Sequence, residues 1–313
     1  MILKKRNTVP NELLSGVKDT LKKSSKYATI AAVAAGSSVV ATNTANAAAV
    51  TLANGSTSTV TQINDATDTV TVADNATAAI ITLNTGDITM ASLGNVGAGN
   101  AVITVTDTNT GGALGVTGDV TVSGGNLTLT FSDDTTTLTL AGNVTESNSK
   151  VAIVNLNSND IVAFSGTSKN VDAKVDGVAD GEGTINVTGT VTFDDSFGSV
   201  KEIGTLNVSG ASTFNAALDV QAVVITANTT LAAAQKSDTI SVTDSVLTVQ
   251  NAMTDTDDGS ETLVLTLNDT SSTGQVTYAS GSAVSHTGTI VAAADGEGKI
   301  LVAEGSGAAG NET

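Results

Sequence analysis

The chain has no cysteine and no tryptophan, and its 313 residues include one proline, Pro10. Without cysteine, the chain must be stable without disulfide bonds. Aromatic residues make up only 2% of the chain, although sugar-binding surfaces usually stack exposed aromatic rings on their ligands. We therefore expect stability to come from a long, regular core of small apolar side chains or from assembly, and we do not expect a sugar-binding site built on aromatic rings.

Catalytic residue types are equally scarce. His286 is the only histidine, and without cysteine or a second histidine a nucleophile–base pair or a histidine-based metal site is difficult to build. Ser285 and His286 do not form a catalytic pair, because neighbouring side chains of a strand point to opposite faces. We interpret His286 as a surface or turn residue. The sequence predicts no catalytic and no cofactor-binding residue, and the protein is not expected to be an enzyme.

The first 47 residues have a composition of their own. A basic region comes first, followed by a soft apolar stretch at 28–41 and then by Ala45-Asn46-Ala47, which matches an A-x-A cleavage signal. This order predicts a secretory signal peptide over residues 1–47, with Ala45 and Ala47 at the cleavage site and an extended basic n-region. We therefore expect an exported protein, located at the bacterial cell surface or in the extracellular medium. The basic residues of this segment are Lys4, Lys5, Arg6, Lys18, Lys22, Lys23 and Lys26.

Basic residues are rare after residue 47. Of the 13 basic residues in the chain only six lysines follow this point, against 31 acidic residues of which only Glu12 and Asp19 precede it. Such an acidic surface repels nucleic acid and anionic lipid. No nucleic-acid partner is therefore expected.

Short runs of alternating apolar and polar residues follow one another from residue 48 onward. Val, Ile and Thr suit pleated strands, and the Gly, Asn, Asp and Ser clusters between the runs suit turns. The stretch Thr229–Ser237 is the one segment expected to make a single helical turn. Strands are predicted at Thr69–Ala73, Ala101–Val105, Asp119–Val122, Leu127–Phe131, Thr137–Ala141, Thr184–Val187, Thr190–Phe193, Thr205–Val208, Ala222–Ile225 and Thr262–Leu267.

The sequence also repeats itself. The heptapeptide at 179–185 (ADGEGTI) recurs at 294–300 as ADGEGKI, and Leu156-Asn157 upstream of the first copy matches Leu267-Asn268 upstream of the second. These anchors define repeat units of about 150–187 and 265–302, and such periodicity is typical of solenoids. We expect residues 48–313 to form an all-β, right-handed parallel β-helix. Tandem β-sandwich domains are the alternative, although they usually have a more aromatic core.

Three short motifs point to a family. They are the ADGEGTINV opening, the run Ile203–Val208 (IGTLNV), and Ser212–Asn215 (STFN) followed by a hydrophobic strand. The stretch that holds them, Gly181–Leu231, resembles the passenger region of rickettsial outer membrane protein B-type and related alphaproteobacterial autotransporter surface antigens. The resemblance is clearest over residues 150–302. It implies a β-helical passenger displayed outside the cell, with a role in adhesion, invasion or a surface layer.

Members of that family end in a membrane β-barrel, which exports and anchors the passenger. The last ten residues, 304–313 (EGSGAAGNET), have none of the aromatic-girdled strands that a barrel needs. An outer-membrane barrel is therefore expected downstream or is absent. The expected partner is a receptor on a host or neighbouring cell, or another copy of the chain.

One acidic turn is a candidate for calcium. Asp255, Asp257, Asp258 and Glu261 surround Gly259, and Ca²⁺ prefers hard oxygen ligands on such turns. The spacing does not match an EF-hand loop. A calcium site here would favour the alternative function, a self-assembling surface-layer or filament protein.

Two pairs of adjacent carboxylates could in principle supply an acid and a base for a glycan hydrolase. They are Asp133-Asp134 and Asp194-Asp195. Both lie in turn-like sequence, where aspartate is expected for turn hydrogen bonds. The hydrolase is therefore the third and weakest hypothesis.

Overall fold

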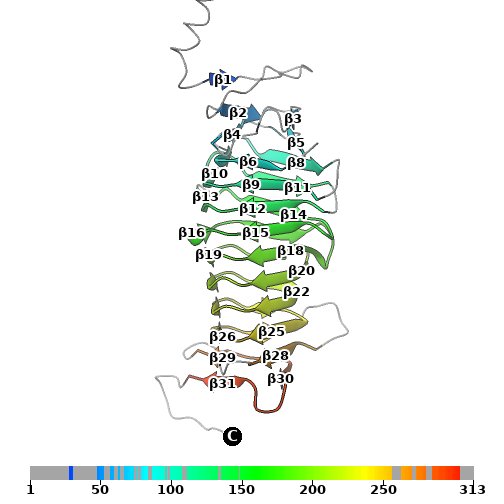
Figure 1. Ribbon diagram of the computed structural model, residues 1–313, viewed down its shortest axis with the longest axis vertical. Helices are drawn as coiled ribbons and strands as arrows, with labels where there is room; N and C mark the ends of the chain where they lie inside the picture. The colour runs from blue at the N-terminus through cyan, green and yellow to red at the C-terminus, as the bar shows by residue number, and fades with distance from the viewer. Residues whose placement is uncertain are drawn as a thin grey trace, which may run out of the picture.

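The structure is a computed structural model (Figure 1). All the regular secondary structure of the described residues is β-strand. No helix among these residues has the length and apolar character needed to cross a membrane. The described residues are 28–30, 48–52, 57–59, 63, 67–73, 76, 79–83, 87–95, 97, 99–107, 111–132, 135–147, 149–255, 262–269, 273–279 and 284–303.

Three parallel sheets run along the long axis of the molecule. Sheet A has 13 strands. In order along the axis these are β1 (Ala28–Ile30), β2 (Ala48–Leu52), β4 (Thr69–Val72), β7 (Ser92–Asn95), β10 (Val120–Val122), β13 (Val144–Glu146), β16 (Thr167–Val171), β19 (Thr190–Phe193), β21 (Ser212–Phe214), β23 (Thr229–Leu231), β26 (Val246–Val249), β29 (Gln275–Tyr278) and β31 (Lys299–Val302).

Sheet B is shorter and ends midway along the axis. Its six strands are β3 (Thr57–Thr59), β5 (Ala79–Leu83), β8 (Ala101–Asp107), β11 (Leu127–Phe131), β14 (Ala152–Leu156) and β17 (Lys174–Gly177). Isolated parallel bridges through Phe197 continue this face below β17.

Sheet C forms the third face, and all its strand pairs are parallel as well. Its main path contains β6 (Ile88–Met90), β9 (Ala113–Val116), β12 (Thr137–Leu140), β15 (Ile161–Phe164), β18 (Glu182–Val187), β20 (Ile203–Val208), β22 (Leu218–Ile225), β25 (Thr239–Thr243), β28 (Val264–Asn268) and β30 (Thr289–Ala292). The first residues of β22 also pair with the short β24 (Gln235–Lys236), which pairs with β27 (Met253–Thr254).

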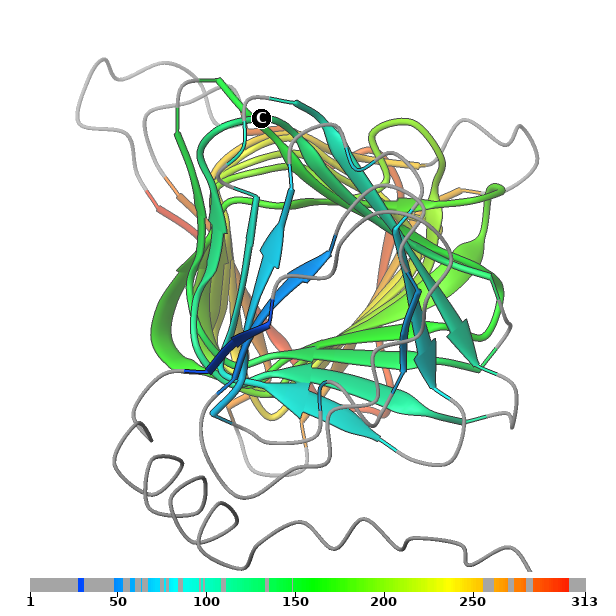
Figure 2. The same cartoon turned by 90° about the horizontal axis from the view of Figure 1, so that it is seen from above.

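The chain visits the faces in the order B, C, A and then moves down to the next coil. This is a right-handed parallel β-helix, as the sequence predicts. The tandem β-sandwich alternative is wrong, because sandwich sheets are antiparallel and every strand pair here is parallel. Seen down the axis, the three sheets form the walls of one tube (Figure 2).

Every second side chain of a strand points into the tube and packs its interior. In β11 and β19 the inward residues are buried, and the Thr side chains between them are partly exposed. Inward residues of successive coils lie above one another, so Leu206, Val223 and Ile240 make one apolar column inside sheet C. Each coil therefore buries its apolar groups against the coils above and below it.

All five phenylalanines of the chain lie in this core. Four of them form one cluster where β15, β19 and β21 meet. The Phe193 ring stacks on Phe214 at 4.8 Å between centroids, and it meets Phe164 and Phe197 edge-on at 5.0 and 5.1 Å. The middle of the solenoid is thus packed with large rings rather than only with small aliphatic residues.

Glycines form a column at the corner between sheets C and A. A Cβ atom on Gly142, Gly189 or Gly210 would fall on a backbone carbonyl oxygen of the coil above, which belongs to Gly118, Gly166 and Gly189 respectively. Successive coils can approach this closely only because these residues have no side chain.

Side-chain oxygens next to these glycines accept backbone N–H groups of the next coil. Asn143 N donates to Asp119 Oδ1 at 2.8 Å, and Asn170 N donates to Asn143 Oδ1 at 3.2 Å. Such bonds satisfy donors that the sheets leave open where the chain turns. The number of residues per coil varies, since equivalent bonds join positions 27 residues apart at Asn170 and 18 residues apart at Val246.

One local prediction is wrong. The stretch Thr229–Ser237 contains no helical turn, and it forms β23 and β24 instead. Its alanines and lysine favour a helix locally. Leu231 and Gln235 are nevertheless buried, and β23 pairs with strands on both sides, so tertiary contacts override the local preference.

The two copies of the repeated heptapeptide have the same turn conformation. Gly181 and Gly183 have φ values of 79° and 79°, and Gly296 and Gly298 have 83° and 76°. Glycine adopts such positive φ values without steric cost because it has no Cβ atom. Leu156 packs closely against Gly183, as Leu267 does against Gly298.

The second copy lies one face further around the tube. Leu156 is on sheet B and its match Leu267 is on sheet C, while Ile185 is on sheet C and its match Ile300 is on sheet A. The same turn conformation can therefore occur at different corners of the tube.

Candidate functional site

The predicted calcium turn lies largely outside the described residues. Asp255 directly follows β27, whereas Asp257, Asp258 and Glu261 are not described. Within the described ranges no group of three or more His, Cys, Asp or Glu side chains could hold a metal ion. The calcium site remains a prediction, and so does the cleavage site, because Ala45 and Ala47 are not described either.

Four carboxylates of successive coils gather where the chain leaves sheet A. Glu146 ends β13, Asp172 follows β16, and Asp194 and Asp195 follow β19. Burial raises the pKa of Glu146, and the charges of Asp195 and Asp172 raise it further. The pKa of Asp172 is also raised, first by burial and then by the charge of Asp194. Like charges thus stack along this corner.

These carboxylates accept hydrogen bonds from backbone and side-chain donors. Asn215 Nδ2 donates to Asp194 Oδ1 at 2.6 Å, and the backbone N–H of Ser196 donates to Asp195 Oδ1 at 2.8 Å. Ala152 N donates to Glu146 Oε1 at 2.6 Å. Each acid accepts bonds that hold a turn or join coils, which is the role that turn sequence predicts. The other predicted pair, Asp133 and Asp134, lies outside the described residues.

The first repeated turn is held by its acidic side chains. Glu182 Oε2 accepts the backbone N–H of Ala179 at 2.8 Å, within the turn itself. Lys201 Nζ donates to Asp180 Oδ2 at 2.9 Å, and this bond lowers the pKa of Asp180 below its ordinary value. Glu182 therefore holds the turn itself, and Asp180 joins the turn to the next coil.

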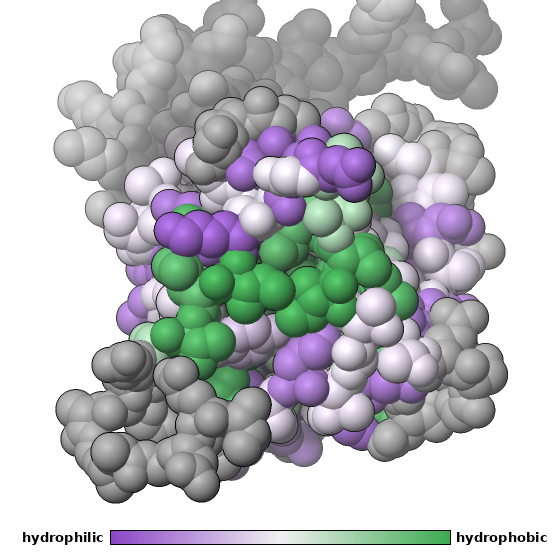
Figure 3. All heavy atoms as spheres, turned by 90° about the horizontal axis from the view of Figure 1, so that it is seen from below, coloured by the Kyte–Doolittle hydropathy of each residue, from purple (hydrophilic) through white to green (hydrophobic). Residues whose placement is uncertain are grey.

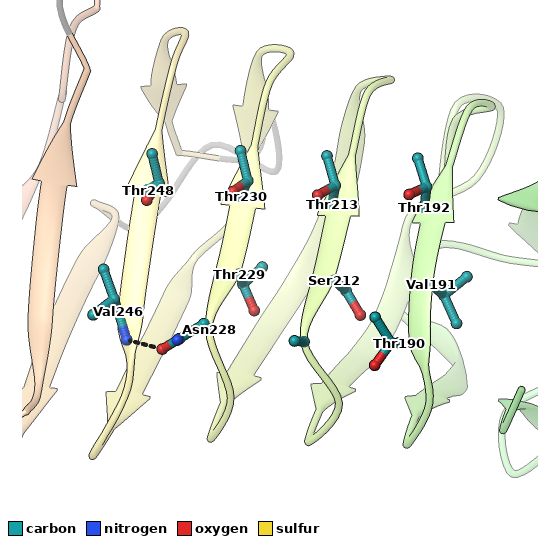
Figure 4. A pocket seen from close by; sticks show the side chains of 11 residues that line it. Thr190, Val191, Thr192, Ser212, Thr213, Asn228, Thr229, Thr230, Val246 and Thr248 are labelled. Atoms are coloured by element: carbon teal, nitrogen blue, oxygen red, sulfur yellow. Dashed lines mark hydrogen bonds between the residues drawn. The ribbon is translucent and has the colours of Figure 1, made fainter. Parts of the chain in front are cut away.

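A shallow groove lies on the outer face of sheet A. Its volume is about 420 Å³. Its floor carries a column of threonines, because Thr192, Thr213, Thr230 and Thr248 occupy the same outward position of successive strands (Figure 4). The groove is lined by Thr190, Val191, Thr192, Ala211, Ser212, Thr213, Asn228, Thr229, Thr230, Val246 and Thr248.

The groove has no ionisable side chain in its lining. It offers hydroxyl and methyl groups that repeat at strand spacing, about 4.8 Å. The Asn228 side chain closes one edge, where its Oδ1 accepts the Val246 N–H at 3.0 Å. Such a surface can bind through hydrogen bonds and shallow apolar contact, and it holds no acid–base pair. The alternation in each strand predicts these outward threonines, but only the inter-coil register aligns them.

His286 is less exposed than its sequence position suggests. It forms a parallel bridge with Met253, and its ring meets Tyr278 edge-on at 6.3 Å between centroids. Neither ring nitrogen has a hydrogen-bond partner among the described groups. Burial lowers the pKa of His286 below its ordinary value, because an imidazolium loses its hydration there. The histidine packs in the lower part of the tube rather than in a free turn.

This environment predicts a pH dependence of stability. Because the pKa of His286 is lower in the folded chain, the unfolded chain binds more protons, and stability should fall as the pH drops below about 6.5. The raised pKa values of Glu146 and Asp172 act in the opposite sense. We therefore expect His286→Asn to lose less stability than the parent chain between pH 7.5 and pH 5. Urea unfolding at both pH values measures the difference, and equal losses would contradict the prediction.

Comparison of the chain with models of protein families, with curated proteins and with solved structures found no match.

Proposed function

We propose that the chain is an exported scaffold of the bacterial cell surface, the passenger part of a surface antigen that acts in adhesion or as a surface coat. The observation that carries this proposal is the long parallel β-helix itself. Its apolar residues line the inside of the tube, and its outer faces carry repeated Thr, Asn and carboxylate side chains. Such a rod holds a polar, anionic surface away from the membrane without any chemical step.

The groove on sheet A supports the adhesive role. Its uncharged hydroxyl column presents the same groups coil after coil, so a receptor on a host or neighbouring cell would meet many equivalent contacts. Affinity would then come from the sum of weak hydrogen bonds along the rod. The anionic surface further favours a partner other than nucleic acid.

Export is tested by the site of processing. The full chain expressed in a Gram-negative host should leave the cytoplasm and begin at Ala48, as mass spectrometry of the intact product would show. Ala47→Asp should leave the precursor uncut, because the cleavage enzyme needs a small residue there. Asn46→Asp is the matched control, since the middle position of the signal tolerates change. A product that retains residues 1–47 in the parent chain would contradict export.

Display is tested on the bacterium that makes the protein. An antibody against the folded β-helix should label intact cells, and a protease added outside should remove the label. Labelling only after the cells are opened would contradict a surface location.

A self-assembling surface-layer or filament protein is the second candidate, and the exposed apolar side chains of β31 favour it. If calcium drives assembly, sedimentation velocity should show large species with Ca²⁺ and monomers with chelator. Asp255→Asn with Asp257→Asn should then abolish the response. Identical sedimentation in both buffers would leave the display scaffold as the better account.

A further inference from the structure

Each copy of the repeated heptapeptide contains an Asp-Gly bond, which is Asp180-Gly181 in the first copy and Asp295-Gly296 in the second. Such a bond is chemically reactive, because glycine has no side chain to hinder attack of its backbone nitrogen on the aspartate carboxyl carbon. The two turns have the same backbone conformation, as their positive φ values show. A difference in reactivity between them should therefore come from what surrounds each turn.

The first turn is fixed by the next coil. Asp180 accepts hydrogen bonds from Lys201 Nζ at 2.9 Å and from the backbone N–H of Glu202 at 3.3 Å. The nitrogen that would attack is also occupied, because Gly181 N donates to Glu202 O at 3.0 Å. The Gln221 side chain lies within 2.7 Å of the point where a Cβ atom of Gly181 would stand. Both reacting groups are thus held in place.

The second turn lacks these contacts. Among the described residues, no hydrogen bond or ion pair holds the Asp295 carboxylate or the Gly296 nitrogen. A Cβ atom at Gly296 would meet nothing within 4 Å, and residues 291–296 are all exposed. Seen from below, this end of the molecule presents apolar side chains that no further coil of the described residues covers (Figure 3). The carboxyl group and the nitrogen can therefore approach each other.

We propose that Asp295-Gly296 is a site of spontaneous isoaspartate formation, and that the next coil protects Asp180-Gly181 from the same reaction. The modification needs water and no enzyme or cofactor. It follows from the two environments of one turn, so it does not depend on the proposed surface function or on calcium.

The reaction is a rearrangement without a net change of mass. The Gly296 nitrogen forms a bond to Cγ of Asp295, and the amide proton leaves with the carboxyl OH as water, which gives a five-membered succinimide ring. Water then opens the ring at one of its two carbonyl groups. Opening at Cγ restores aspartate. Opening at the main-chain carbonyl gives isoaspartate, in which the main chain runs through the former side chain.

The ion pair of the first turn slows this reaction further. The carboxyl group reacts in its neutral form, because a carboxylate has no OH to lose. The hydrogen bond from Lys201 lowers the pKa of Asp180 below its ordinary value, and the bond from Glu202 N acts in the same direction. The reactive form of Asp180 is therefore rare as well as immobile.

Peptide mapping of the folded full chain tests the proposal, because it assigns the product to each Asp-Gly bond separately. After weeks in mildly acidic buffer, fragmentation that distinguishes isoaspartate from aspartate should find isoaspartate at position 295. Position 180 should contain at least about tenfold less, since breaking a hydrogen bond to a charged group costs that factor or more. In concentrated urea the coils separate, and the two positions should then react at equal rates.

Two variants separate the causes. Asp295→Glu should abolish the product at this position, because glutamate would have to form a six-membered ring, which closes far more slowly. Lys201→Met keeps the apolar stem of the lysine and removes the ion pair, so it should raise the amount of isoaspartate at position 180 while the circular dichroism spectrum stays unchanged.

Three results would overturn the proposal. The first is a folded chain without isoaspartate at position 295, and the second is a folded chain with equal amounts at positions 180 and 295. The third is a difference between the two positions that persists unchanged in urea, since the neighbouring sequence and not the fold would then set the rates.

Discussion

Replacing Phe193 with alanine should lower the free energy of unfolding by about 3–5 kcal/mol, as for other large aromatic residues removed from cores. Phe193 is fully buried, and its ring contacts Phe164, Phe197 and Phe214. Its loss leaves a cavity between three rings in the middle of the tube. Because each coil is stabilised only by its neighbours, the damage should spread to the coils above and below.

Urea unfolding followed by far-UV circular dichroism measures this effect. Phe193→Leu keeps most of the volume but loses the ring contacts, so it should cost clearly less than alanine. Val200→Ala, at a 76% exposed position, should change stability by less than about 0.5 kcal/mol. If Phe193→Ala were no more costly than Val200→Ala, the cluster would not stabilise the tube.

Replacing Gly189 with alanine should have a comparable effect for a different reason. A Cβ atom at Gly189 would overlap the carbonyl oxygen of Gly166, and a backbone atom cannot move aside as a side chain can. The two coils would have to separate at this corner, which would strain the hydrogen bonds of sheets A and C on either side. We expect a loss of about 3 kcal/mol or more, at the upper end of overpacking costs.

Gly115→Ala is the matched control for this prediction. Gly115 faces outward on β9, and its nearest neighbour for a new Cβ is Thr89 Oγ1 at 3.5 Å, an ordinary contact. Alanine should be tolerated there within about 0.5 kcal/mol. Equal effects at Gly115 and Gly189 would mean that the glycine column is not a point of close approach between coils.

Much of the fold is predictable from local pattern. Alternating apolar and Thr residues give the bounds of Leu127–Phe131 and Thr190–Phe193 as the structure has them. This succeeds because one face of each strand is buried and the other is wet. The low aromatic content and the sequence repeats favour a solenoid over a sandwich, and the parallel sheets agree.

Features that depend on coil length are not predictable in this way. The spacing between register partners ranges from 17 residues, as between Leu206 and Val223, to 29, as between Thr248 and Thr277, so the sequence does not show which residues lie above one another. The phenylalanine cluster, the threonine column and the glycine corner all depend on that register. The repeated heptapeptide illustrates the difficulty, because its two copies serve different corners of the tube.

The candidate sites also have features that the sequence predicts and features that it does not. The turn roles of Glu182 and Asp195 follow from residue type, since acidic side chains in turns accept nearby backbone N–H groups. The partners of Asp180 do not, because they are Lys201 and Glu202 of the next coil. The packing of His286 against Tyr278 does not, because Ser285-His286-Thr287 has the composition of a turn. Burial of a residue between coils is a property of the stack and not of its immediate neighbours in sequence.

The in-register stacking of coils is the central claim, and distances between spin labels test it most directly. Cysteines placed in pairs at Thr192 and Thr248, and at Thr192 and Thr277, carry the labels on one outward column of sheet A. The second pair is one coil longer, so its mean distance should exceed the first by about 4.8 Å, the spacing of neighbouring strands. A difference that does not follow the number of coils would contradict the stacked β-helix and every inference drawn from its columns.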